Sequence, residues 1–129
     1  EIDMSIRLNH TIVWTRNKAA SSAFLSSVLG RPNPTRYGPF AVVQLDNDVS
    51  LDFHDTDGTI APQHYAFLVS DAEFETILER IRQRGIRYFA DPARSKPNEI
   101  NSNDGGQGCY FEDPDGHLLE IITRPYGSG

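Results

Sequence analysis

The chain has 129 residues, of which 38% are hydrophobic and 23% charged, and its formal net charge at pH 7 is −6. This length fits one domain, residues 1–129, that can bury a core without disulfides. The acidic balance and the scattered basic residues argue against nucleic acid as a partner. No apolar stretch approaches the roughly 20 residues of a membrane span, and no signal-peptide pattern opens the chain.

The single cysteine, Cys109, cannot form a disulfide within the chain. A lone cysteine is typical of a reducing compartment, so the sequence predicts a cytoplasmic protein. We expect Cys109 to behave as a small buried apolar residue rather than as a reactive thiol.

The first half of the chain predicts a strand, a helix and three further strands. Residues 7–15 alternate as a strand does, and Asn17 has the character of an N-cap for a helix that Gly30 ends. Short strands follow near residues 36–37, 40–45 and 49–54, and Asn47-Asp48 forms the last hairpin turn.

The second half repeats this order. A strand is predicted at 63–69, and Ser70 begins a helix whose apolar stripe continues until Gly85. Three more strands are predicted, with a tight turn over Asp113 to Gly116 between the last two; the strands cover residues 86–89, 108–112 and 117–123. Residues 91–106 are polar and rich in glycine and proline, which predicts a long loop that is either functional or mobile.

The repeated order predicts an α+β fold of two tandem βαβββ modules, one at about 6–55 and one at about 62–123, followed by a short C-terminal tail. Each helix has to cover one face of a sheet, which leaves the other face free to form something concave. Period-two alternation then decides which side chains lie on that uncovered face.

Alternation places His10, Asp52, His64 and Glu120 on the uncovered face. Two imidazoles with one or two carboxylates suit a divalent ion such as Zn, Ni, Mn, Co or Fe(II). The sequence therefore predicts metal ligation by these four residues, although the short side chain of Asp52 makes it the weakest member. His117 falls on the opposite face, where we expect an ordinary surface turn residue.

Several other side chains are predicted around the same cavity. Four of them carry aromatic rings able to stack on a planar substrate, namely Trp14, Tyr37, Phe40 and Tyr110. Alternation adds the aliphatic Ile12 and Leu68, and these six residues form the predicted substrate-binding set. His54 shares the face of Asp52, so both are candidates for acid–base work beside Glu120.

Three stretches resemble the vicinal oxygen chelate superfamily, which includes glyoxalase I, extradiol dioxygenases, fosfomycin-resistance enzymes and bleomycin resistance proteins. They are Leu8 to His10, His64 to Phe67, and the most specific one, Tyr110 to Glu120. The resemblance implies a cupped mixed sheet with the helices on its outer face, and a homodimer. It also implies one divalent metal ion held by His10, His64 and Glu120.

This resemblance implies a small-molecule enzyme in which the metal chelates vicinal substrate oxygens for lyase, isomerase or dioxygenase chemistry. Asp52 would be a fourth ligand or a general base, although it matches the fourth ligand of glyoxalase I only approximately. A dioxygenase would use Tyr110 or His54 as its acid–base residue.

The sequence also bears on two other functions. Fosfomycin-modifying members carry a Thr where this chain has Ile12 and an Arg where it has Gly129, which argues against that activity. A binding protein that sequesters a small molecule without turnover, in the manner of bleomycin resistance proteins, is the alternative to an enzyme.

Overall fold

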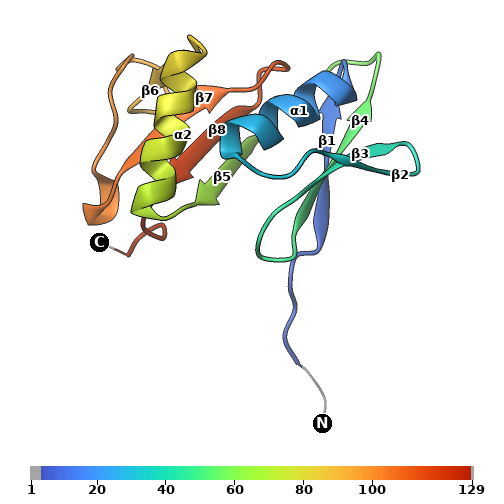
Figure 1. Ribbon diagram of the computed structural model, residues 1–129, viewed down its shortest axis with the longest axis horizontal. Helices are drawn as coiled ribbons and strands as arrows, with labels where there is room; N and C mark the ends of the chain where they lie inside the picture. Colours follow the sequence, from blue (N-terminus) through green and yellow to red (C-terminus); the bar gives the residue numbers. More distant parts are fainter. Residues whose placement is uncertain (1–3, 129) are drawn as a thin grey trace. The chain divides into compact units, whose positions relative to one another are not determined.

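The structure of the chain is a computed structural model that describes residues 4–128 (Figure 1). Gly129, which bears on the comparison with fosfomycin-modifying enzymes, lies outside the described residues. The chain divides into two compact units, Glu1–Ile60 and Ala61–Gly129. Each unit is described here by itself.

The first unit contains one helix and one four-stranded mixed sheet. Its elements are β1 (His10–Thr15), α1 (Lys18–Leu29), β2 (Thr35–Tyr37), β3 (Phe40–Gln44) and β4 (Ser50–Asp55). The strand order is β1-β4-β3-β2, with β1 parallel to β4 and the other pairs antiparallel.

Helix α1 begins and ends where the sequence predicts. The side chain of Asn17 accepts a hydrogen bond from the backbone N–H of Ala20 at 3.1 Å, and Gly30 adopts the left-handed conformation with φ 70°. The hydroxyls of Thr15 and Ser21 lie 2.8 Å apart in the buried region and join β1 to the helix. Helix α1 therefore covers one face of the sheet, where Val13, Leu51 and Phe53 are buried.

The second unit repeats the plan of the first. Its elements are β5 (His64–Leu68), α2 (Asp71–Gln83), β6 (Tyr88–Phe89), η1 (Asn103–Gly105), β7 (Gly108–Glu112) and β8 (Leu118–Ile122). The strand order β5-β8-β7-β6, with β5 parallel to β8, matches that of the first sheet position for position.

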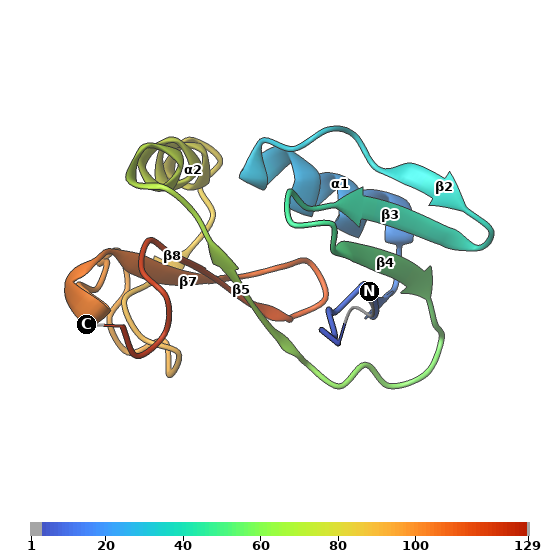
Figure 2. The same cartoon turned by 90° about the horizontal axis from the view of Figure 1, so that it is seen from below.

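Helix α2 is amphipathic and lies across one face of its own sheet (Figures 1 and 2). The hydroxyl of Ser70 accepts a hydrogen bond from the backbone N–H of Glu73 at 3.1 Å, which supplies the predicted N-cap. The apolar stripe is buried at every position; it consists of Phe74, Ile77, Leu78 and Ile81. The predicted α+β fold with two βαβββ modules is confirmed, as two four-stranded mixed sheets.

Some predicted strands are longer than the observed ones. The first was predicted at 7–15, but β1 starts at His10 because its partner β4 begins opposite at Ser50. The strand predicted at 86–89 is reduced to Tyr88–Phe89, since only these two residues pair with β7. Alternation in the sequence continues past the point where a partner strand is available, and pairing sets the boundary.

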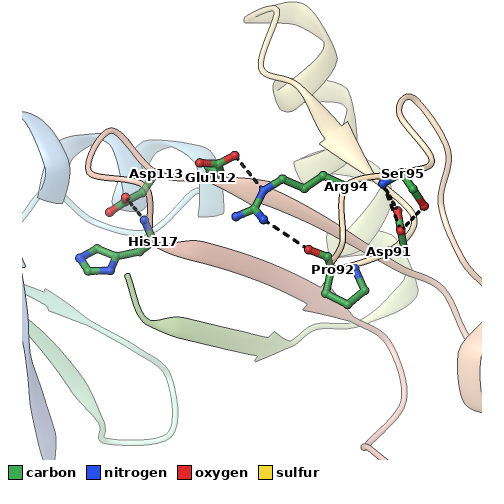
Figure 3. Close-up of polar contacts among 7 residues, drawn as sticks. All are labelled: Asp91, Pro92, Arg94, Ser95, Glu112, Asp113 and His117. Atoms are coloured by element: carbon green, nitrogen blue, oxygen red, sulfur yellow. Dashed lines mark hydrogen bonds and ion pairs between the residues drawn. The ribbon is translucent and has the colours of Figure 1, made fainter. Parts of the chain in front are cut away.

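The predicted loop at 91–106 is largely irregular but is tied to the sheet (Figure 3). The carboxylate of Asp91 accepts hydrogen bonds from the backbone N–H groups of Ser95 and Lys96. Arg94 forms an ion pair with Glu112 on β7 at 2.9 Å. Farther along, Asn101 exchanges two backbone hydrogen bonds with Gly108, so both ends of the segment are fixed to the β6–β7 hairpin.

Among residues 4–128 no helix combines the length and the apolar character that crossing a bilayer demands.

Cys109 on β7 is fully buried, and burial, with a smaller effect of the Glu120 charge, raises the pKa of its thiol to about 12. We expect an aromatic disulfide reagent at pH 8 to modify this cysteine only as the protein unfolds, because almost no thiolate is present in the fold. The measurement is the labelling rate against urea concentration. Labelling in native buffer as fast as that of free cysteine would contradict the packing described for β7.

Candidate metal site

In the first unit, the uncovered sheet face carries the predicted side chains in regular rows. The strand pairing aligns His10 with Ser50, Ile12 with Asp52 and Trp14 with His54. Exposure alternates along β1, since Ile12 is 38% and Trp14 45% exposed whereas the intervening residue is buried. The side chains that alternation assigned to the uncovered face therefore lie on it.

His10 is exposed, and its Nδ1 lies 2.8 Å from the amide oxygen of Asn9. An amide oxygen only accepts hydrogen bonds, so Nδ1 carries the proton. In the neutral ring, Nε2 then keeps a lone pair available for a metal ion.

Asp52 lies at the centre of this face and is only 8% exposed. It is flanked in register by Ile12 and Val42, and the hydroxyl of Ser50 donates a hydrogen bond to its Oδ1 at 2.8 Å. A carboxylate with one hydrogen bond and apolar neighbours retains acceptor capacity for a ligand proton.

In the second unit, His64 and Glu120 meet. Their Nε2 and Oε1 atoms are 3.0 Å apart, and the Glu120 side chain is 6% exposed against 47% for His64. The other ring nitrogen, Nδ1, lies 3.0 Å from the backbone carbonyl oxygen of Leu118. The strands that carry them, β5 and β8, are parallel neighbours, with His64 paired to Leu118 and Ala66 to Glu120.

This geometry determines what can lie between the two side chains. Because a carbonyl oxygen is only an acceptor, Nδ1 of His64 must be the donor, and in the neutral ring Nε2 presents a lone pair to Glu120. A lone pair facing a carboxylate oxygen needs a cation between them, either a proton on Nε2 or a metal ion. A histidine whose Nδ1–H is held by a carbonyl is also the usual arrangement of a metal ligand.

Tyr110 on β7 supports the carboxylate. Its ring stacks beside that of His64 at a centroid distance of 6.0 Å, and its hydroxyl donates a hydrogen bond to Glu120. Burial is the main cause that raises the pKa of Tyr110 to about 12, and this hydrogen bond and the Glu120 charge add to it. The phenol is therefore protonated at neutral pH and acts as a donor.

The donor set fits a divalent metal ion of the kind that imidazole and carboxylate ligands prefer. Within residues 61–128, no third His, Cys, Asp or Glu lies close enough to His64 and Glu120 to complete a ligand group. Metal ligation by His10 and Asp52 stays a prediction.

The other predicted site residues are distributed over the two units. In the first unit, His54 contacts the rings of Trp14 and Phe40, and its Nδ1 donates to the backbone carbonyl of Asp55 at 2.7 Å. Tyr37 is 76% exposed near the tip of the β2–β3 hairpin. In the second unit, Leu68 is 60% exposed at the end of β5.

The prediction that His117 is a surface residue is wrong, because it is 1% exposed. Its Nδ1 accepts a hydrogen bond from the backbone N–H of Gln63 at 2.9 Å, and the backbone N–H of His117 donates to Oδ1 of Asp113 (Figure 3). Alternation does place His117 away from Glu120, but that face carries Leu119 and Ile121 and is the buried one. The same period-two pattern could have placed it in the core.

Comparison with known proteins agrees with this fold. Residues 7–121 match the family model described as the Glyoxalase/Bleomycin resistance protein/Dioxygenase superfamily. The match extends over most of the chain, so the chain belongs to this superfamily.

Individual relatives are similar over nearly the whole chain. The solved structure of Oxidase ChaP-H1 has 58% sequence identity and a TM-score of 0.94, covering 95% of this chain and 99% of that one. Oxidase ChaP-H2 has 58% identity and a TM-score of 0.95, covering 98% and 99%. Glutathione transferase FosA of Serratia marcescens is 30% identical over 120 residues, which cover 88% of this chain and 78% of that protein.

Metal affinity tests the His64–Glu120 pair. We expect Glu120→Gln and His64→Ala each to weaken binding of Zn²⁺ or Co²⁺ by more than about ten-fold, a change of about 1.4 kcal/mol. Titration calorimetry on metal-stripped protein measures the affinity, with Glu75→Gln on the exposed side of α2 as the control. Unchanged affinity in Glu120→Gln would remove this residue from the ligand set.

His117 should contribute to stability rather than to the reaction. We expect His117→Leu to lower the free energy of unfolding by about 1–3 kcal/mol, because the Gln63 N–H loses its acceptor. Urea unfolding measures this loss, and His10→Leu at an exposed position is the matched control. Equal stability of His117→Leu and the wild type would show that the hydrogen bond is dispensable.

Proposed function

We propose that this chain is a metal-dependent oxidase or dioxygenase that acts on a small molecule with two neighbouring oxygen atoms. The observation that carries the proposal is the His64–Glu120 pair, in which Nε2 and Oε1 are 3.0 Å apart while a backbone carbonyl holds Nδ1. Such a pair is pre-oriented to hold a cation without rearranging its imidazole.

The relatives support oxidation over the other reactions that fit the sequence. Two proteins with 58% identity over nearly the full length are named oxidases. The transferase from Serratia marcescens is more distant, at 30% identity. We therefore propose oxidation for this chain in preference to a lyase or isomerase reaction.

In this proposal, His64 and Glu120 hold the ion. When bound, the ion supplies Lewis-acid polarisation of the two substrate oxygens and, if it is redox-active, a route for electrons to dioxygen. Tyr110 keeps Glu120 in place through its hydroxyl hydrogen bond.

Asp52 is proposed as the general base that accepts a proton from a substrate hydroxyl. Its position on the uncovered face, with Ser50 donating to Oδ1, leaves Oδ2 for this role. His54, whose Nδ1 is occupied by a carbonyl, offers Nε2 on the same face as a second acceptor.

Oxygen consumption tests the proposal. Protein stripped of metal and reloaded separately with Fe(II), Mn, Co, Ni or Zn is given a catechol-type diol in an oxygen electrode. We expect uptake with at least one redox-active metal, and a loss of about 10²–10⁴-fold in kcat for Asp52→Asn if Asp52 is the base. The exposed Asp57→Asn is the control and should keep full activity.

The opposite result would identify a different class of protein. If the protein bound diols tightly but consumed no oxygen with any of the five metals, it would be a small-molecule binding protein and not an enzyme. Uptake that survives Glu120→Gln unchanged would show that the reaction does not depend on the proposed ligand.

A further inference from the structure

The four histidines of the chain fall into two groups according to the hydrogen bond at Nδ1. In His10, His54 and His64, an amide or carbonyl oxygen lies 2.7–3.0 Å from this nitrogen. Such an oxygen only accepts, so in the neutral ring the proton stays on Nδ1 and Nε2 keeps a lone pair. The buried His117 has the opposite arrangement, because its Nδ1 accepts the backbone N–H of Gln63 and the proton is left to Nε2.

The acceptor for His10 differs in kind from the acceptors for the other two rings of its group. His54 and His64 are held by backbone carbonyl oxygens. The acceptor for His10 is the side-chain amide oxygen of Asn9, at 2.8 Å. A backbone carbonyl is present whatever residue occupies the position, whereas an amide oxygen requires a particular side chain. The tautomer of His10 therefore depends on the identity of residue 9.

The place of Asn9 immediately before β1 makes this contact possible. Side chains of successive strand residues point to opposite faces of a sheet, which keeps neighbours within a strand apart. Because β1 begins at His10, Asn9 lies outside the strand and its side chain can reach the imidazole. The backbone of Asn9 is nevertheless fixed, since its carbonyl oxygen accepts a hydrogen bond from the N–H of Ser50 at 3.0 Å.

Water competes with this hydrogen bond, because Asn9 and His10 are both exposed. A neutral histidine surrounded by water carries its proton mainly on Nε2. That tautomer has no lone pair on Nε2, and the proton has to leave this nitrogen before a metal ion can bind there. The amide oxygen of Asn9 opposes the preference in water, since it stabilises the proton on Nδ1.

We propose that Asn9 is a positioning residue, whose amide oxygen keeps the proton of the His10 ring on Nδ1 and leaves Nε2 open as a ligand for a divalent ion. The inference rests on the proposed function for the ion. The position of the proton is a property of the metal-free protein and can be measured without an ion.

Long-range proton–nitrogen NMR correlation at pH 8 on metal-free protein tests the tautomer, because protonated and unprotonated ring nitrogens have well-separated shifts. In the wild type we expect His10 to carry its proton on Nδ1, and His10→Leu identifies its signals. Asn9→Leu removes the acceptor and should move most of the population to Nε2–H. Asn9→Asp keeps an oxygen at the same position and should retain Nδ1–H.

The remaining histidines are internal controls in the same spectra. His54 and His64 should keep Nδ1–H, and His117 should keep Nε2–H, in every Asn9 variant, which also shows that the variants are folded. Asn33→Leu is the matched control, because Asn33 is an exposed asparagine of the same unit outside the strands. It should leave the tautomer of His10 unchanged.

Titration calorimetry with Zn²⁺ measures the consequence for metal binding. Loss of a group that holds a ligating histidine typically costs about 10–100-fold in metal affinity. Because the Asn9–His10 hydrogen bond is exposed, we expect Asn9→Leu to lose about three- to ten-fold, at or below the lower end of this range. Asn33→Leu should bind Zn²⁺ as the wild type does.

The two measurements separate this inference from the proposed function. A proton on Nε2 of His10 in the wild type, or on Nδ1 in Asn9→Leu, would overturn the role of Asn9. A proton that moves while the Zn²⁺ affinity stays the same would overturn the claim that His10 serves the ion. If His64→Ala and Glu120→Gln also left the affinity unchanged, the proposed function would fail, and the NMR result would still decide whether Asn9 sets the tautomer.

Discussion

The hydrogen bond from His64 Nδ1 to the carbonyl oxygen of Leu118 organises the chemistry proposed for this protein. It exists because β5 and β8 are parallel neighbours in register, which brings His64 beside Leu118 and places Glu120 two residues farther along the same strand. A backbone acceptor cannot move away or titrate, so the orientation of the imidazole is built into the sheet. In the proposed metal site, affinity for the ion would therefore depend on strand register as much as on the two side chains.

The fold could be predicted from the sequence because its signals are local and repeated. Capping residues such as Asn17 and Ser70, and the stripe of α2, act within one turn of helix, where spacing in the sequence is spacing in space. Strand ends were predicted less well, since β1 and β6 end where their partners end. The partner of a strand lies far away in the sequence, so the residues of the strand itself do not indicate where the pairing ends.

For the candidate site, alternation placed the side chains on the correct faces but could not supply their partners. Nothing in the sequence indicates that Leu118 would fix the ring of His64, or that Tyr110 would donate to Glu120. For His117 the alternation pattern indicates the correct face of β8. That face was expected to be exposed, but in the structure it is the buried core. A period of two separates two faces, and only packing determines which face is buried.

The protein has one tryptophan, Trp14, which is half-exposed beside the ring of His54 on the first sheet. An indole at such a place emits light whose colour and intensity depend on whether water or another ring touches it. A ligand that contacts Trp14 would therefore change this emission, with no other indole to obscure the signal. Screening of compound collections against the unlabelled protein becomes practical for this reason.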